Sequence, residues 1–123
     1  MRIKPNDIPA LRDKIASEQG NQCWLCEISL DSVVACLDHD HQTGLIRGVL
    51  CNNCNGIEGK IFNLARRAKR DKTPTDVLIA ILTYWDSFAK ENKGLIHPSH
   101  RTPEEKRVKR NRQARLRRKN KLK

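Results

Sequence analysis

Two Cys-x-x-Cys pairs constrain the fold of this chain more than any other feature. Cys23 and Cys26 form the first pair, and Cys51 and Cys54 form the second, with 24 residues between them. Each pair can place two thiolates on one side of a tight turn, so two such turns complete a tetrahedral zinc site. Two disulfides or four buried free thiols are the alternatives. A site filled by four cysteines has no open position, so we expect structural Zn²⁺ contributing on the order of 10 kcal/mol to folding.

The composition explains why such a chain needs a metal. With 123 residues, 37% of them hydrophobic and 4% aromatic, the chain can build one domain with a thin core. No apolar stretch reaches the roughly 20 residues of a membrane span, and no signal peptide opens the sequence. We therefore predict an intracellular protein without a membrane partner, where cysteines favour metal binding over disulfides. Cys36 is left over and is expected to be a buried small hydrophobe.

Almost all of the net charge of +11 lies at the C-terminal end. Residues 101–123 contain 12 Lys and Arg against two Glu, whereas residues 1–100 are nearly balanced. A basic block of this kind is usually a solvated arm, and a phosphate backbone is its commonest partner.

The local patterns predict a small α+β fold. A helix is expected over 8–19, ended by Gly20 in a left-handed conformation. The first Cys pair forms a knuckle over 21–30. Strands are expected over 33–37 and 45–50, joined by a turn at 42–44. This hairpin brings both strands close to the second Cys pair.

Three helices are predicted after the hairpin. The first starts at Cys51 or Asn52 and runs to about Arg70, although two glycines weaken it near its start. The second covers 75–90, capped by Thr73, with an apolar stripe suited to a core or a subunit interface. The third starts near Thr102 and is expected to fray without DNA because its positive charges repel. We therefore divide the chain into a core at 1–72, a packing or dimerisation helix at 73–92, and a linker with a basic DNA-binding tail at 93–123.

Asp38, His39 and Asn55 form the candidate chemical site. Asp38 and His39 lie at the end of the first predicted strand, and Asn55 directly follows the last zinc cysteine. Carboxylate and amide oxygens are hard ligands that suit Mg²⁺. An imidazole, whose ordinary pKa is about 6.5, can take a proton from an attacking water. Closure of the zinc site would hold these residues together, which suits hydrolysis of a phosphodiester.

Simpler interpretations exist for the same residues. Asp38, His39, Asp40 and His41 could form a turn with solvated side chains, or a second zinc site. The chain could also be a non-catalytic zinc-containing DNA-binding or regulatory protein, in which Asp38, His39 and Asn55 only shape a loop. A metal-dependent DNA endonuclease is favoured because it alone explains these three residues together.

The motifs resemble the phage recombination endonuclease VII family. The resemblance rests on the first Cys pair, on Leu37 to His41, and on the run from Gly44 through Cys51 and Cys54 to Asn55, and it extends more weakly over residues 8–98. The family belongs to the HNH or His-Me finger nucleases. The resemblance therefore implies a zinc-braced ββα-metal core, a catalytic Mg²⁺ or Mn²⁺, and double-stranded or branched DNA as substrate. It also implies a homodimer built by the helices after the core.

The resemblance assigns roles to individual residues. Asp38 and Asn55 would hold the metal and His39 would be the general base, with Glu58 near the metal and His41 in support. Arg47 and Gly48 match the family's Arg-Gly before the second Cys pair. The structural interpretation of these two residues is that Gly48 eases a close turn and Arg47 pairs with a carboxylate or a phosphate. Residues beyond 100 depart from junction-resolving members, which leaves nicking or homing activity open. The candidate DNA-binding residues are Arg47, Lys60, Arg66, Arg67, Arg110, Arg112, Arg115, Arg117 and Arg118.

Overall fold

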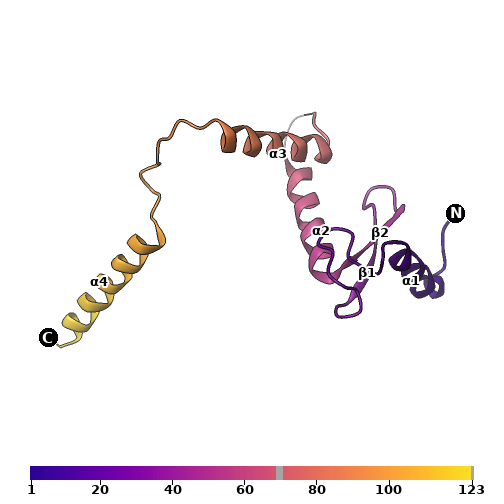
Figure 1. The fold of residues 1–123 in the computed structure, drawn as a ribbon, viewed down its shortest axis with the longest axis horizontal. Helices are drawn as coiled ribbons and strands as arrows, with labels where there is room; N and C mark the ends of the chain where they lie inside the picture. The colour runs from indigo at the N-terminus through magenta and orange to yellow at the C-terminus, as the bar shows by residue number, and fades with distance from the viewer. Residues whose placement is uncertain (69–70, 123) are drawn as a thin grey trace. The chain divides into compact units, whose positions relative to one another are not determined.

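The computed structural model describes residues 1–68 and 71–122 (Figure 1). It divides into two compact units, residues 1–82 and residues 83–123. The elements are a short 3₁₀ helix η1 (Pro5–Asp7), α1 (Ile8–Glu18), β1 (Ala35–His39), β2 (Ile46–Cys51), α2 (Asn52–Arg67), α3 (Pro74–Lys90) and α4 (Pro103–Lys121). This is the small α+β fold that the sequence predicts. The functional division at residues 72 and 92 stays a prediction.

Helix α1 ends where the sequence predicts. Gly20 has a φ of +70° and Asn21 a φ of +56°, so the chain turns in the left-handed region that glycine and asparagine tolerate. The backbone N–H of Asn21 donates a hydrogen bond to the carbonyl of Ala16 at 2.8 Å. This sharp end directs the chain into the first Cys knuckle.

The two strands form an antiparallel hairpin, each shifted slightly from its predicted range. Asp40 closes the turn, because its Oδ1 accepts hydrogen bonds from the backbone N–H of Gln42 (2.7 Å) and of Thr43 (3.0 Å). The hydrogen bond from Thr43 has the larger effect on the pKa of Asp40, and together with the one from Gln42 it holds that pKa below its usual range. Gly44 supplies the positive φ, +78°, that the turn needs.

The hairpin contains a β-bulge. The pair Leu37–Val49 is followed by the pair His39–Ile46. One residue of β1, Asp38, therefore faces two residues of β2, Arg47 and Gly48. A bulge re-aims the side chains beside it. Here it places Arg47 next to Asp38.

Helix α2 packs on both strands and completes a ββα unit. Cys51 is its N-cap, and the Cys51 sulfur accepts a hydrogen bond from the backbone N–H of Cys54 at 3.4 Å. The helix continues through both of its glycines and ends at Arg67, because Ala68 is extended. The predicted end at Arg70 lies outside the described residues.

The core of the first unit is small and contains much of the predicted zinc site. Its buried members are Ala16, Cys23, Leu30, Val49, Leu50, Cys51 and Cys54. Three of these seven side chains are thiols of the two Cys pairs. Hydrophobic burial of this size is limited, so a metal held by the thiols would add to the stability of the fold.

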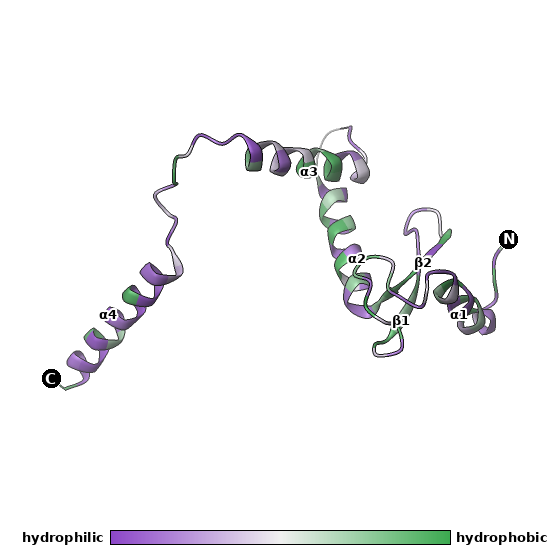
Figure 2. Ribbon diagram, viewed as in Figure 1, coloured by the Kyte–Doolittle hydropathy of each residue, from purple (hydrophilic) through white to green (hydrophobic). Residues whose placement is uncertain are grey.

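Helices α3 and α4 form close to their predicted positions. The Oγ1 of Thr73 accepts a hydrogen bond from the N–H of Asp76, and the Oγ1 of Thr102 accepts one from Glu105, each at 3.2 Å. Green segments mark the apolar residues of α3, whereas α4 is mostly hydrophilic (Figure 2). The structure gives α4 as a continuous helix; the fraying of α4 in solution stays a prediction. No helix in the described part of the chain is both long and apolar enough to cross a bilayer.

Candidate metal and nuclease site

The four cysteines of the two pairs come together as predicted. The sulfur atoms of Cys23, Cys26, Cys51 and Cys54 all lie within 4.8 Å of one another. Cys26 Sγ and Cys51 Sγ are 3.8 Å apart, far beyond a disulfide bond length of about 2.05 Å. Four sulfurs at about 2.3 Å from a tetrahedral zinc are separated by close to this distance. The donor set therefore fits Zn²⁺, and Cys36 is outside it.

Two of the four thiols have pKa values far from the ordinary value for cysteine. Burial opposes ionisation of Cys23, but hydrogen bonds from the backbone N–H groups of Cys26, Cys51 and Leu25 outweigh it and lower the pKa of Cys23 to about 6. Burial and the neighbouring sulfurs raise the pKa of Cys54 to about 12. Four thiolates crowded together repel one another, so a divalent cation is needed to ionise all of them.

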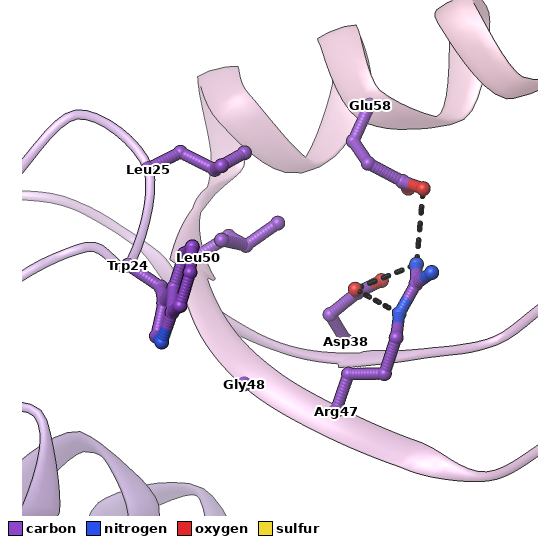
Figure 3. A pocket seen from close by; sticks show the side chains of 7 residues that line it. All are labelled: Trp24, Leu25, Asp38, Arg47, Gly48, Leu50 and Glu58. Atoms are coloured by element: carbon purple, nitrogen blue, oxygen red, sulfur yellow. Dashed lines mark hydrogen bonds and ion pairs between the residues drawn. The ribbon is translucent and has the colours of Figure 1, made fainter. Parts of the chain in front are cut away.

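Arg47 joins two carboxylates from different elements. Its Nε and Nη2 both lie 2.7 Å from Asp38 Oδ2, and its Nη2 lies 3.0 Å from Glu58 Oε1. Figure 3 shows the three side chains pointing toward one another, Glu58 from α2 and the other two from the strands. Asp38 is 7% exposed. The hydrogen bond with Asp38, followed by the one with Glu58, raises the pKa of Arg47 above its usual value.

Arg47 uses only one oxygen of each carboxylate. Both of its contacts with Asp38 end on Oδ2, which leaves Oδ1 without a hydrogen bond among the described residues. The contact with Glu58 ends on Oε1, while Oε2 is buried without a hydrogen-bond partner there. A buried carboxylate oxygen without a hydrogen bond is costly unless a positive group lies near it, and here His41 Nε2 lies 3.8 Å from Glu58 Oε2. These oxygens fit a hard divalent cation.

Two histidines flank the carboxylates. His41 Nε2 lies 3.8 Å from Glu58 Oε2, and the His41 ring stacks on Phe62 with centroids 5.6 Å apart. His39 ends β1 and is exposed, with its ring 5.4 Å from that of His41. His39 is therefore open to solvent and to a ligand. The side chain of His41 instead contacts two residues of α2, Glu58 and Phe62.

Asn55 lies in the first turn of α2, directly after Cys54, and is partly buried. Within residues 1–68 and 71–122 its side chain makes no hydrogen bond, so the structure gives no direct link between Asn55 and Asp38. The role of Asn55 as a metal ligand stays a prediction.

The predicted DNA-binding residues lie on several elements. Arg47 belongs to the carboxylate network, in agreement with the predicted pairing to a carboxylate. The others are exposed on α2 (Lys60, Arg66, Arg67) and on α4 (Arg110, Arg112, Arg115, Arg117, Arg118). No described contact tests their binding of DNA.

The contact between Gln19 and the strand beside the bulge could not be predicted from the sequence. Gln19, at the end of α1, donates from Nε2 to the carbonyls of Val49 (2.9 Å) and Gln22 (3.0 Å), and it accepts from the N–H of Val49 at 2.8 Å. Its amide therefore pairs with β2 like a short strand. A polar residue just before a helix-ending glycine gives no signal of such a long-range contact.

The fold and its two clusters define a class of protein: a small ββα unit with four clustered cysteines that presents carboxylates and histidines from its hairpin and from α2. The chain belongs to the recombination endonuclease VII family, whose model matches residues 2–87. The gene 59 proteins of Mycobacterium phages L5 and D29 are each 42% identical to it over 38 residues. That match covers 30% of this chain and 23% of each relative.

Proposed function

We propose that this protein is a metal-dependent DNA endonuclease of the HNH or His-Me finger type that hydrolyses phosphodiester bonds. The observation that supports it best is a pair of carboxylates, Asp38 on the hairpin and Glu58 on α2, beside two histidines and next to the cluster of four cysteines. Membership of the recombination endonuclease VII family supports the same reaction. Structural zinc in the Cys cluster would preorganise the site.

In this proposal Asp38, Asn55 and Glu58 would hold one Mg²⁺ or Mn²⁺. When bound, that ion supplies positive charge to the phosphate and to the leaving 3′ oxygen. His39 receives the proton of the attacking water, which its exposed place at the end of β1 permits. His41 supports the site through Glu58, at 3.8 Å.

We propose that the substrate is double-stranded or branched DNA. The protein would therefore act inside a cell. The basic residues of α4 would bind the phosphate backbone. They surround this helix instead of lining one face, and no apolar face suits a membrane surface. Three kinds of DNA site are alternatives within this proposal: a branched junction, a site that is nicked on one strand, and a homing site.

Replacement of His39 tests the chemistry. We expect His39→Ala to lower the cleavage rate by about 10²–10⁴-fold, because the proton acceptor is lost, while DNA affinity stays unchanged. The exposed His100, in the second unit, provides the control variant His100→Ala. Cleavage would be followed with linear, nicked and four-way-junction DNA, with Mg²⁺ and with EDTA. Wild-type cleavage by His39→Ala would refute the assignment of His39.

The same assay separates the alternative function. A non-catalytic zinc-containing DNA-binding or regulatory protein would bind these DNAs and cut none of them at any concentration of Mg²⁺ or Mn²⁺.

A further inference from the structure

Arg47 makes a contact that the proposed reaction does not require. Its guanidinium lies between the two carboxylates that are candidates for metal binding, within 3.0 Å of an oxygen on each. A residue that only bound the DNA backbone would have no reason to join β2, β1 and α2 in this way. The arrangement depends on the bulge, because that irregularity places Arg47 beside Asp38.

The contact affects the binding of a metal ion in two opposing ways. The planar fork of a guanidinium fixes both carboxylates in direction. Within the described part of the chain it leaves Asp38 Oδ1 and Glu58 Oε2 without a hydrogen bond. Its positive charge also neutralises part of the negative charge that attracts a divalent cation. Arg47 therefore favours the geometry of the metal site and opposes its occupancy.

We propose that Arg47 is a positioning residue for the reaction, because its guanidinium orients Asp38 and Glu58. The permanent positive charge of the same guanidinium weakens the binding of a metal ion to these carboxylates. This inference rests on the proposed function, because it concerns the same site. It predicts that affinity for the metal and rate of cleavage change in opposite directions when the charge is removed.

The test uses the full, zinc-loaded chain with Arg47→Gln and Arg47→Lys. Binding of Mn²⁺ is titrated by electron paramagnetic resonance, and cleavage is measured at saturating Mn²⁺. For Arg47→Gln we expect Mn²⁺ to bind about tenfold more tightly or better, since a positive charge a few ångströms away is removed. We expect cleavage to slow by at least about tenfold, because the carboxylates are no longer oriented.

Arg47→Lys separates charge from geometry. Lysine keeps the charge, but its single ammonium cannot reproduce the fork between two carboxylates. We expect Mn²⁺ affinity within about threefold of the unchanged chain, together with cleavage slowed by about tenfold. Arg12→Gln, which removes a surface ion pair with Asp13 on α1, serves as the control and should change neither quantity. Zinc content and circular dichroism establish that each variant is folded.

The outcomes are distinct. Unchanged or weaker Mn²⁺ binding by folded Arg47→Gln would overturn the inference and leave the proposed function intact. Wild-type cleavage by Arg47→Lys would overturn the positioning role, and this variant carries the test alone if Arg47→Gln does not load zinc. If the unchanged chain neither binds Mn²⁺ nor cuts DNA, the proposed function fails, and the inference fails with it.

Discussion

At the scale of single residues, Gln19 and Gly48 set the shape of the hairpin beside the site. The Gln19 amide satisfies both backbone groups of Val49, which is fully buried. An added Cβ on Gly48 would lie 2.9 Å from Gln19 Oε1. A Cβ at this position would therefore push the Gln19 amide away from the backbone of Val49.

We expect Gly48→Ala to lower the free energy of unfolding by about 1–2 kcal/mol, because the Gln19 amide must move away from Val49. Urea unfolding of the zinc-loaded protein measures it. Combined with Gln19→Ala, the loss should be less than additive, since both changes break the same bonds. Gly59→Ala is the matched control, because its Cβ would meet nothing within 4 Å. Inside a helix it should instead stabilise by about 0.5–1 kcal/mol. Equal losses for both variants would contradict this account.

At the scale of elements, α3 is the helix that leaves the most apolar side chains exposed. Its apolar stripe consists of Val77, Leu78, Ile81, Leu82, Trp85 and Phe88, and no residue of the helix is buried. Leu82 is 60% exposed and Trp85 64%. Exposed apolar side chains gathered along one helix are typical of an interaction site. The predicted homodimer would cover it.

We expect Leu82→Glu to convert a dimer into a monomer, because a carboxylate in an apolar interface loses its hydration without gaining a partner. Light scattering coupled to size exclusion gives the mass. Ala80→Glu places the same charge on the opposite side of the helix and should leave the dimer intact. A monomeric unchanged chain would rule out the homodimer.

At the scale of the whole molecule, two different physical forces act on two parts of the chain. The first unit, residues 1–82, contains the small core with the Cys cluster inside it. The second unit, residues 83–123, contains the basic helix α4. A metal bound by the thiols would stabilise the former, and the positive charge of the latter suits an anionic partner.

Removal of zinc should unfold the first unit. We expect a strong chelator to abolish the tertiary structure, with the loss reversed by added Zn²⁺, because the thiols form part of the core. Cys26→Ser should lose zinc, whereas Cys36→Ser should keep it, since only Cys26 belongs to the cluster. Metal analysis and circular dichroism measure both. Acid should also release the metal as protons compete for the thiolates. A folded, zinc-free first unit would contradict the structural role.

Removal of residues 101–123 should weaken DNA binding and flatten its dependence on salt. Each lost phosphate contact lowers the slope of log K against log salt by about 0.9. Fluorescence anisotropy at several salt concentrations measures the slope. A neutral Gly/Ser tail of equal length is the control for chain length. A slope unchanged by the truncation would show that α4 does not bind the backbone.

Much of the fold could be predicted from local signals. Gly20 and Gly44 end a helix and close a turn through positive φ, and Thr73 and Thr102 cap helices. The Cys pairs were predicted to converge because their spacing suits one tetrahedral site. The strand limits were shifted by one or two residues. The pairing register that decides them depends on contacts with the other strand and with Gln19.

The sequence by itself determined which donors the chain possesses: four thiols in two turns, a carboxylate and histidine pair, and a basic C-terminal segment. These follow from residue type and short spacing, where local geometry leaves few choices. Only the tertiary structure decided that Arg47 pairs with Asp38 and Glu58, that one oxygen of each carboxylate stays free, and that Gln19 holds β2. Those contacts join residues 9 to 30 positions apart. They depend on strand register and on the packing of α1 and α2 against the hairpin, which local residue patterns do not determine.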